Sequence, residues 1–307
     1  MLKNATSWFP VAILLLSGCE HFKVSLAIDT TTPVLKIASQ SFNREGDLIL
    51  AAQAAPAQLK TVEGFLAAAP DTPELLELVA QGYIEYAFGF VEDELESQPD
   101  DSAHEASRAQ LTKRATDYYD RARAYAMKII AADSRDFGAA FGKDAATVEA
   151  AAANVDKAAV AGLFYAGMAL GSAINLNRND VARIVELPKA IALIKRAYEL
   201  NPKFYNGGGA MLLGVIYSSQ GKAIGGNPEQ AKKYFEDAIA STDGKFLLAK
   251  VMMARFYAVV VQDRALYDKT LKEVIDASED IYPEYKLANQ IAKRRAVRYL
   301  AHAEDYF

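Results

Sequence analysis

Apolar positions follow helical spacing along most of the chain, and the alternating pattern of a half-buried strand is missing. Several helix starts can be read directly. Thr72-Pro73, Leu187-Pro188 and Asn227-Pro228 place proline in a first turn, and Asn227 adds a side chain suited to capping. Ser102 with Glu105 predicts a capping box at another start. We therefore predict an all-α protein.

A pattern of small and large residues recurs in successive helix pairs and is typical of tetratricopeptide repeats. A small residue marks the point where the first helix crosses its partner, and Ala-x₃-large-x₂-small follows in the second helix. The small residues Gly171, Gly214 and Ala254 recur about every 40 residues, and a weaker copy begins at Val79. The sequence thus predicts a modified tetratricopeptide-like solenoid of helical hairpins, with about four repeats plus flanking helices. The alternative is a non-repeating helical bundle.

This register also predicts a surface for ligands or partners. In such hairpins the first helix lines the concave face with the residues three before, one after and four after the crossing residue. These positions are Met168, Ser172, Asn175, Met211, Val215, Ser218, Val251, Arg255 and Ala258. Methionine suits a surface that accepts varied apolar groups, and the polar members of the set suit the polar end of a ligand. Alternatively, another helix covers this face and makes it ordinary core. Gly225 and Gly226 are interpreted as a turn before the cap at Asn227.

The N-terminus has the pattern of a secretion signal. One cation, a short apolar run and small residues precede Cys19, and Leu16-Ser17-Gly18-Cys19 resembles the lipobox of bacterial lipoproteins. We predict a signal peptide over 1–18, a tether lipidated on Cys19 over 19–32, and a helical domain over 33–307. No later segment is expected to cross a bilayer. The protein is then periplasmic and is held to a membrane by its lipid. The sequence does not decide between the inner and the outer membrane.

Charge and composition narrow the function further. The chain of 307 residues has a formal net charge of −5, one Cys and three scattered His residues. These features argue against a nucleic-acid partner, an internal disulfide and a metal site, and no cofactor is implied. No nucleophile–base set is present, so we expect a protein that is not an enzyme. The acidic run 92–96 is interpreted as the solvated end of a helix. The aromatic cluster Tyr83, Tyr86, Phe88 and Phe90 is interpreted either as an apolar cleft or as core.

A family resemblance covers almost all of the chain after the signal. The residues that carry it are, in order, Gly46-Asp47, Ala55-Pro56-Ala57, Tyr83-x₂-Tyr86-Ala87, Leu170-Gly171, Gly207-Gly208-Gly209, Gly225-Gly226-Asn227 and Leu287-Ala288-Asn289. This order resembles the T-component family of TRAP transport systems. The chain departs from the pattern at Gln220, where a proline is expected.

The resemblance implies a function and partners. It implies a lipoprotein that forms a homotrimer with apolar clefts or pores and binds the periplasmic solute-binding (P) component of a TRAP transporter. The leading hypothesis is a non-enzymatic accessory protein that docks this component and holds or passes a small hydrophobic ligand. The alternative is a scaffold lipoprotein that organises envelope-assembly machinery without touching a ligand.

Overall fold

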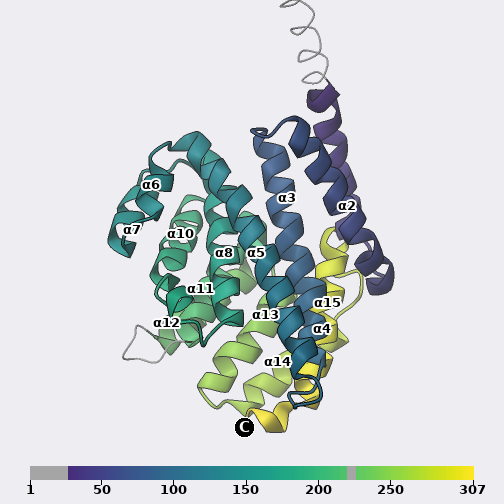
Figure 1. Ribbon diagram of the computed structural model, residues 1–307. Helices are drawn as coiled ribbons and strands as arrows, with labels where there is room; N and C mark the ends of the chain where they lie inside the picture. Colours follow the sequence, from purple (N-terminus) through teal and green to yellow (C-terminus); the bar gives the residue numbers. More distant parts are fainter. Residues whose placement is uncertain (1–26, 220–225) are drawn as a thin grey trace, which may run out of the picture.

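The computed structural model describes residues 27–219 and 226–307, and every regular element in these ranges is helical, as predicted. A first helix covers residues 27–43. The helices that build most of the core (Figure 1) are α2 (Leu48–Ala68), α3 (Pro73–Tyr86), α5 (Glu105–Asp133), α8 (Val160–Leu176), α10 (Leu187–Leu200), α11 (Gly208–Ser219), α12 (Pro228–Ala240), α14 (Arg264–Asp276) and α15 (Lys286–Ala301). Shorter helices are α4 (Glu92–Ser97), α6 (Phe137–Phe141), α7 (Ala145–Ala153), α9 (Val181–Ile184) and α13 (Leu248–Met252).

Two π-helical turns interrupt this α-helical pattern. The first, η1 (Ala87–Val91), joins α3 to α4, and the second, η5 (Met253–Ala258), continues α13. Turns of this kind are frequent at functional sites, because they shift the direction in which side chains leave the helix. Both turns contribute residues to the site described below.

The N-terminal boundaries can be compared with only part of the prediction. The signal segment 1–18, the lipidation position Cys19 and the turn residue Gly225 lie outside the described residues. The helix over 27–43 begins inside the segment 19–32 that is predicted to be a tether, and Ile28 within it is buried. Packing of an apolar side chain such as Ile28 favours helix over an extended linker.

Side-chain caps explain the starts of α2, α7, α9, α12 and α14. Asn227 caps α12 through a hydrogen bond from the Gln230 amide, at 3.1 Å, as predicted. The capping box predicted at Ser102 and Glu105 is wrong. The Asp101 carboxylate instead accepts from the amides of Ala103 and His104 at the start of α5. A charged acceptor so close to the helix start can satisfy free amides without a serine cap.

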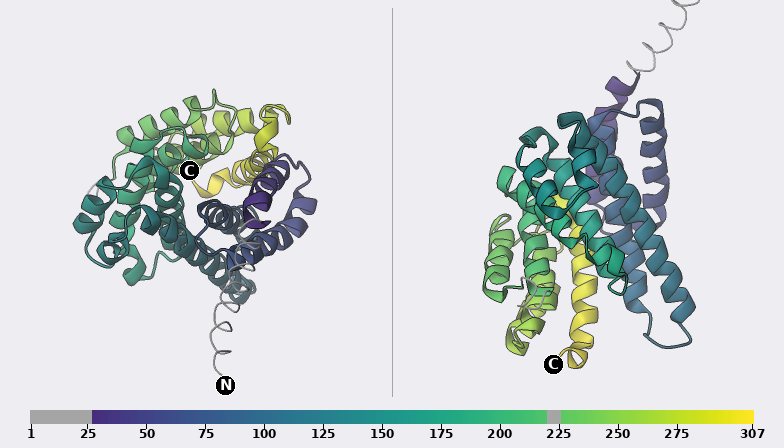
Figure 2. Two further views of the ribbon diagram at one scale, coloured as in Figure 1. Left: turned by 90° about the horizontal axis from the view of Figure 1, so that it is seen from above. Right: turned by 60° about the vertical axis from the view of Figure 1, so that its left-hand side comes forward.

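The helices pack in chain order around the molecule (Figure 2). Helix α2 packs on α3, α3 on α5, α5 on α8 and α8 on α10, and α11 pairs with α12. Helix α14 then packs on α15, and α15 returns to α2. One buried cluster fills the space among α2, α3, α5 and α8, and a second lies among α11 to α15. The C-terminal helix α15 therefore packs against α2, in the N-terminal part of the described chain.

Helix α8 is the most apolar element. By length and composition alone, Lys157–Leu176 is long and apolar enough to cross a bilayer, which differs from the expectation that no segment after the signal would be. However, 78% of this apolar stretch is buried inside the fold. A helix that is apolar on all sides is expected wherever neighbours cover it all round. Here α5 and α10 pack against it.

The close crossings of the hairpins agree with the predicted register at one glycine and not at another. A Cβ added to Gly214 would lie 2.9 Å from the Phe235 ring, so α11 and α12 do meet at this residue. A Cβ on Gly171 would meet nothing within 4 Å, so its interpretation as a crossing residue is wrong. The close approach of α8 to α10 lies one turn earlier, where a Cβ on Gly167 would stand 2.7 Å from Ile194 Cγ1. Residues four apart share a helix face, which explains the shift.

Candidate functional site

A cavity of about 490 Å³ lies among α8, α11, η5 and α15. The structure brings six of the residues predicted for the groove together on its wall: Met168, Ser172, Asn175, Met211, Val215 and Arg255. They come from three different helices, so the cavity exists only in the folded chain. Gly171 also lines it, and its lack of a side chain leaves space there.

Other predicted groove residues do not reach the cavity. Val251 is completely buried in the protein core, and Ser218 is 2% exposed, whereas its neighbour Ser219 lines the cavity. Ala258 is also fully buried. The π-helical turn η5 explains the failure at Val251 and Ala258, because its i→i+5 hydrogen bonds widen the turn. Residues 251, 255 and 258 therefore no longer share one face.

The cavity wall is mainly apolar and adaptable. Met168, Met211 and Met252 contribute thioether side chains, and Leu248 and Phe256 add larger apolar surfaces. Methionine side chains adjust to ligands of different shape because they are unbranched and polarizable. A wall of this kind, with a few polar groups, is typical of sites that bind small molecules.

Arg255 is a charge on this wall without an ion pair in the described part of the chain. Its guanidinium lies 4.2 Å from the centroid of the Tyr306 ring, in a cation–π contact. Within residues 27–219 and 226–307, no carboxylate oxygen lies within 4.0 Å of it. Cation–π contacts stabilise a guanidinium without using up its hydrogen-bond donors. Arg255 can therefore still donate to a polar group of a ligand.

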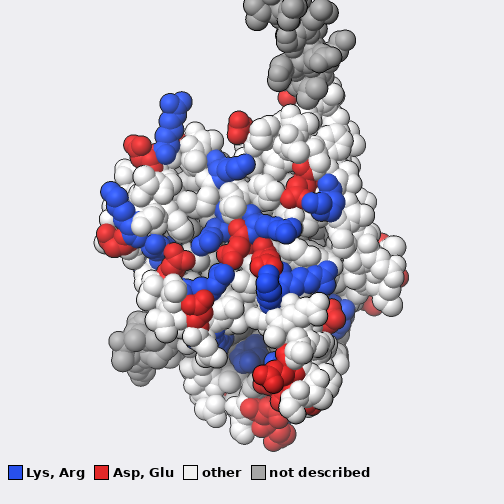
Figure 3. Space-filling model, viewed as in Figure 1, with Lys and Arg blue, Asp and Glu red and all other residues white. Residues whose placement is uncertain are grey.

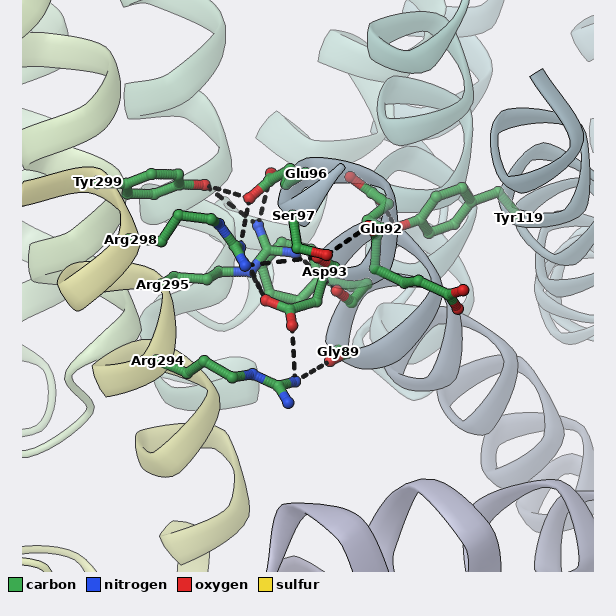
Figure 4. A network of polar contacts seen from close by, with 12 residues as sticks. Gly89, Glu92, Asp93, Glu96, Ser97, Tyr119, Arg294, Arg295, Arg298 and Tyr299 are labelled. Carbon is green, nitrogen blue, oxygen red and sulfur yellow. Dashed lines mark hydrogen bonds and ion pairs between the residues drawn. The ribbon is translucent and has the colours of Figure 1, made fainter. Parts of the chain in front are cut away.

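The opposite side of the cavity is formed by charged residues (Figure 4). Arg295 donates to Glu96 Oε1 at 3.0 Å and to the Phe88 carbonyl oxygen at 2.7 Å, and its guanidinium stacks on the Phe88 ring at 3.9 Å. Arg298 bridges Asp93 at 2.8 Å and Glu96 at 2.7 Å. These contacts join α15 to η1 and α4, about 200 residues earlier in the chain.

The structure thus corrects the interpretation of the acidic run 92–96 as a solvated helix end. Glu92 and Asp93 are buried, at 8% and 6% exposure. Asp93 can be buried because Arg294, Arg295 and Arg298 of α15 form ion pairs with it. Glu92 has no such pair among the described residues and accepts a hydrogen bond from the Tyr119 hydroxyl. The sequence signal for this contact is the run Arg294-Arg295-x₂-Arg298, whose spacing places the arginines on adjacent turns. The sequence analysis did not use it.

Glu92 is a carboxyl of this group whose pKa is shifted. Burial raises the pKa of Glu92 to about 7, although the nearby Arg295 charge and the hydrogen bond donated by the Tyr119 hydroxyl both act to lower it. Desolvation outweighs the attraction because the carboxyl has left water almost entirely. Glu92 therefore changes its charge near neutral pH at the edge of the cavity.

The histidines of the described part of the chain lie apart from the cavity. No group of three or more His, Cys, Asp and Glu residues there could hold a metal ion. His104 pairs with Asp101 and His302 with Asp305, both on the surface. Over the face drawn in Figure 3, Lys and Arg alternate with Asp and Glu, without a large patch of one sign.

The aromatic cluster predicted at the end of α3 divides between core and cavity. Tyr83 is 1% exposed and belongs to the core. Phe88 lines the large cavity, and Tyr86, Phe88 and Phe90 line a second, smaller one. Both of the alternatives considered for this cluster are therefore realised, by different residues.

Comparisons with known proteins agree with this architecture. A family model described as TRAP transporter T-component matches residues 44–307. An uncharacterised protein of Treponema pallidum (strain Nichols) is 25% identical over 267 residues, which cover 87% of this chain and 82% of that protein. The family match begins just before α2 and includes every residue that lines the large cavity.

Proposed function

The chain belongs to the TRAP transporter T-component family, which implies a role associated with TRAP transport, and from this premise we propose a specific function for it. The protein is a non-enzymatic accessory component that docks the periplasmic solute-binding (P) component. It holds or passes a small hydrophobic ligand in the cavity among α8, α11, η5 and α15.

The observation that carries this proposal is the large cavity itself. Its volume of about 490 Å³ lies within the range of small-molecule sites, roughly 300–1,000 Å³. Methionines from three helices form an adaptable apolar wall, and Arg255, Ser172 and Asn175 offer polar contacts. A scaffold that touches no ligand would have no need of such a cavity, so the ligand hypothesis is favoured over the scaffold alternative.

The finer architecture is part of the same proposal. We infer that the helix pairs are tetratricopeptide-like hairpins; the Gly214–Phe235 crossing and the packing of helices in chain order support this inference. We also infer a homotrimer, and a lipid on Cys19 that holds the protein at a periplasmic membrane surface. Support for the lipid comes from the residues Leu16-Ser17-Gly18-Cys19.

The ligand cavity can be tested by filling it. A leucine at Gly171 has room for its Cβ and points additional apolar atoms into the cavity. For the neutral fluorescent probe N-phenyl-1-naphthylamine, we expect Gly171→Leu to weaken binding roughly tenfold. Loss of about 60 Å² of apolar contact would cost roughly 1.5 kcal/mol. Gly64→Leu is the matched control, because Gly64 also has open space, lies on exposed α2 surface and is far from the cavity lining.

Three outcomes decide between the readings. Binding that is lost in Gly171→Leu and kept in Gly64→Leu supports the ligand site. Equal binding by both variants would place the probe elsewhere. No binding by the wild type, together with association with envelope-assembly proteins and none with a purified P component, would favour the scaffold.

Lipidation is tested on the full precursor. Cys19→Ala removes the thiol that acylation requires, so we expect the variant to lose a metabolic palmitate label and to leave the membrane fraction. Cys19 is the only cysteine of the chain, so Ser17→Ala serves as the control that keeps the thiol. An unmodified Cys19 in mass spectra of the wild-type mature protein would contradict the anchor.

A further inference from the structure

A second cavity of about 100 Å³ lies where the N-terminal helices meet α15. Its wall includes residues of α2, α3, η1 and α15, and it shares Phe88, Met168 and Leu248 with the large cavity. Aromatic and aliphatic side chains form this wall, and the aromatic ones are Phe42, Tyr86, Phe88, Phe90, Tyr205, Phe246 and Tyr285.

One charged group, Glu85 of α3, faces this aromatic space. Its Oε1 accepts hydrogen bonds from Gln81 Nε2 at 2.7 Å and from the Tyr205 hydroxyl at 2.9 Å. No Lys, Arg or His lines the cavity, and within the described ranges none lies within 4.0 Å of the Glu85 carboxylate. A carboxylate in such surroundings has no counter-ion from the protein.

The position of Tyr205 is set by an unusual backbone. Tyr205, Asn206 and Gly207 have φ values of 48°, 57° and 78°, three consecutive residues in the left-handed region. Surrounding contacts hold this turn in place, because the Tyr282 hydroxyl donates to Asn206 Oδ1 at 2.9 Å and the Ser241 hydroxyl donates to the Asn206 carbonyl oxygen at 3.0 Å. Strained backbone of this kind is characteristic of ligand-holding sites. Its effect here is to hold the tyrosine hydroxyl against Glu85.

We infer that this small cavity binds a small organic ammonium ion, with Glu85 as its counter-ion and the aromatic rings as its walls. Ring faces attract cations, and a buried carboxylate supplies the charge that makes the attraction specific. The two donors on Oε1 stabilise the ionised carboxylate and orient it. This site adjoins the ligand cavity of the proposed function, but the inference does not depend on that function.

The cavity volume limits the size of the ion. A dry cavity of about 150 Å³ accommodates benzene, so about 100 Å³ suits a ligand of roughly five non-hydrogen atoms. Isobutylammonium has this size, and isobutanol is its neutral counterpart of the same shape. Burial raises the pKa of Glu85, so the preference for the cation should grow as pH rises and the carboxyl ionises.

The experiment compares these two probes on the whole mature protein. Methyl NMR of the methionines localises binding, because Met168 borders both cavities whereas Met211 borders only the large one. We expect isobutylammonium to shift the Met168 signal and not the Met211 signal. Its affinity should be at least tenfold higher than that of isobutanol, and Glu85→Gln should abolish this preference. Glu77→Gln is the control, since Glu77 lies on the same helix outside the cavity lining.

Each other result overturns the inference. Equal affinity for the ammonium and the alcohol would mean that Glu85 acts as a neutral hydrogen-bond donor, and absence of binding by both would leave a cavity for water alone. Should Glu85→Gln fail to fold, Tyr205→Phe removes only one hydrogen bond to the carboxylate. In that variant the preference for the cation should fall severalfold, and an unchanged preference would contradict the site.

Discussion

The large cavity has two sides that are built in different ways. On one side, α8 and α11 are held by neighbouring helices of the chain, α10 and α12, through close contacts of small residues with large ones such as Gly214 with Phe235. On the other side, α15 is held to η1 and α4 by arginines and carboxylates about 200 residues apart. The first side depends on shape and local sequence, and the second on charges that are compensated only after folding.

This difference shows which contacts can be predicted from the spacing of residues in the sequence and which cannot. Spacing of small and large residues identifies helix pairs, because both partners are close in sequence and their contact is repeated. A buried ion network has no such period, and its acidic half is indistinguishable from a solvated helix end until its partners are known. Three predictions test the comparison, beginning with the largest expected effect.

Removing a buried arginine should destabilise the charged side most. Arg295→Met leaves Glu96 Oε1 and the Phe88 carbonyl oxygen without the donor that they share, and the loss of two hydrogen bonds from a charged group costs about 3–5 kcal/mol in total. We expect this decrease in the free energy of unfolding in urea titrations. Arg294→Met is the control, because the Arg294 side chain is 37% exposed and the loss there should be about 1 kcal/mol or less. Equal losses would contradict the role assigned to burial.

Adding one methyl group should have opposite effects on stability at Gly214 and at Gly171, the two glycines of the predicted register. Gly214→Ala forces the Phe235 ring to move and should lower the free energy of unfolding by about 1–3 kcal/mol. Gly171→Ala meets open space and should raise it by up to about 1 kcal/mol, since alanine favours helix over glycine. Thermal unfolding measures both. Destabilisation of similar size at the two positions would restore Gly171 as a crossing residue.

The pH dependence of the free energy of unfolding should reveal the protonation of the Glu92 carboxyl. Its pKa is about 7 in the folded protein and 4.5 ordinarily, so the folded state binds more protons between these values. The stability that protonation of Glu92 contributes is therefore complete below pH 4.5 and is lost as pH rises through 7. The free energy of unfolding falls over this range by at most about 1.4 kcal/mol per pH unit. Glu92→Gln should flatten the pH profile of unfolding, while exposed Glu94→Gln should leave it unchanged. Identical profiles for the two variants would exclude a shifted Glu92.

The candidate site was predictable in part. Met168, Ser172 and Asn175, with Met211 and Val215, reach the cavity because they share faces of regular α-helices, where spacing determines direction. Prediction failed at Val251 and Ala258, because the π-helical turn η5 changes that spacing. It also failed at Gly171, where the crossing lies one turn away at Gly167. Periodicity alone does not distinguish two small residues on the same face.

By itself the sequence determined that the described chain is helical, where helices α3, α10 and α12 start, and which family it belongs to. These properties depend on propensities, caps and ordered motifs that act over a few residues. Only the tertiary structure decided where α15 packs, and with it which carboxylates are compensated and where two cavities remain. Arg295 and Glu96, or Glu85 and Tyr205, meet across 199 and 120 positions of sequence. Contacts at such separation depend on the packing of all the helices between them, and no local pattern records that packing.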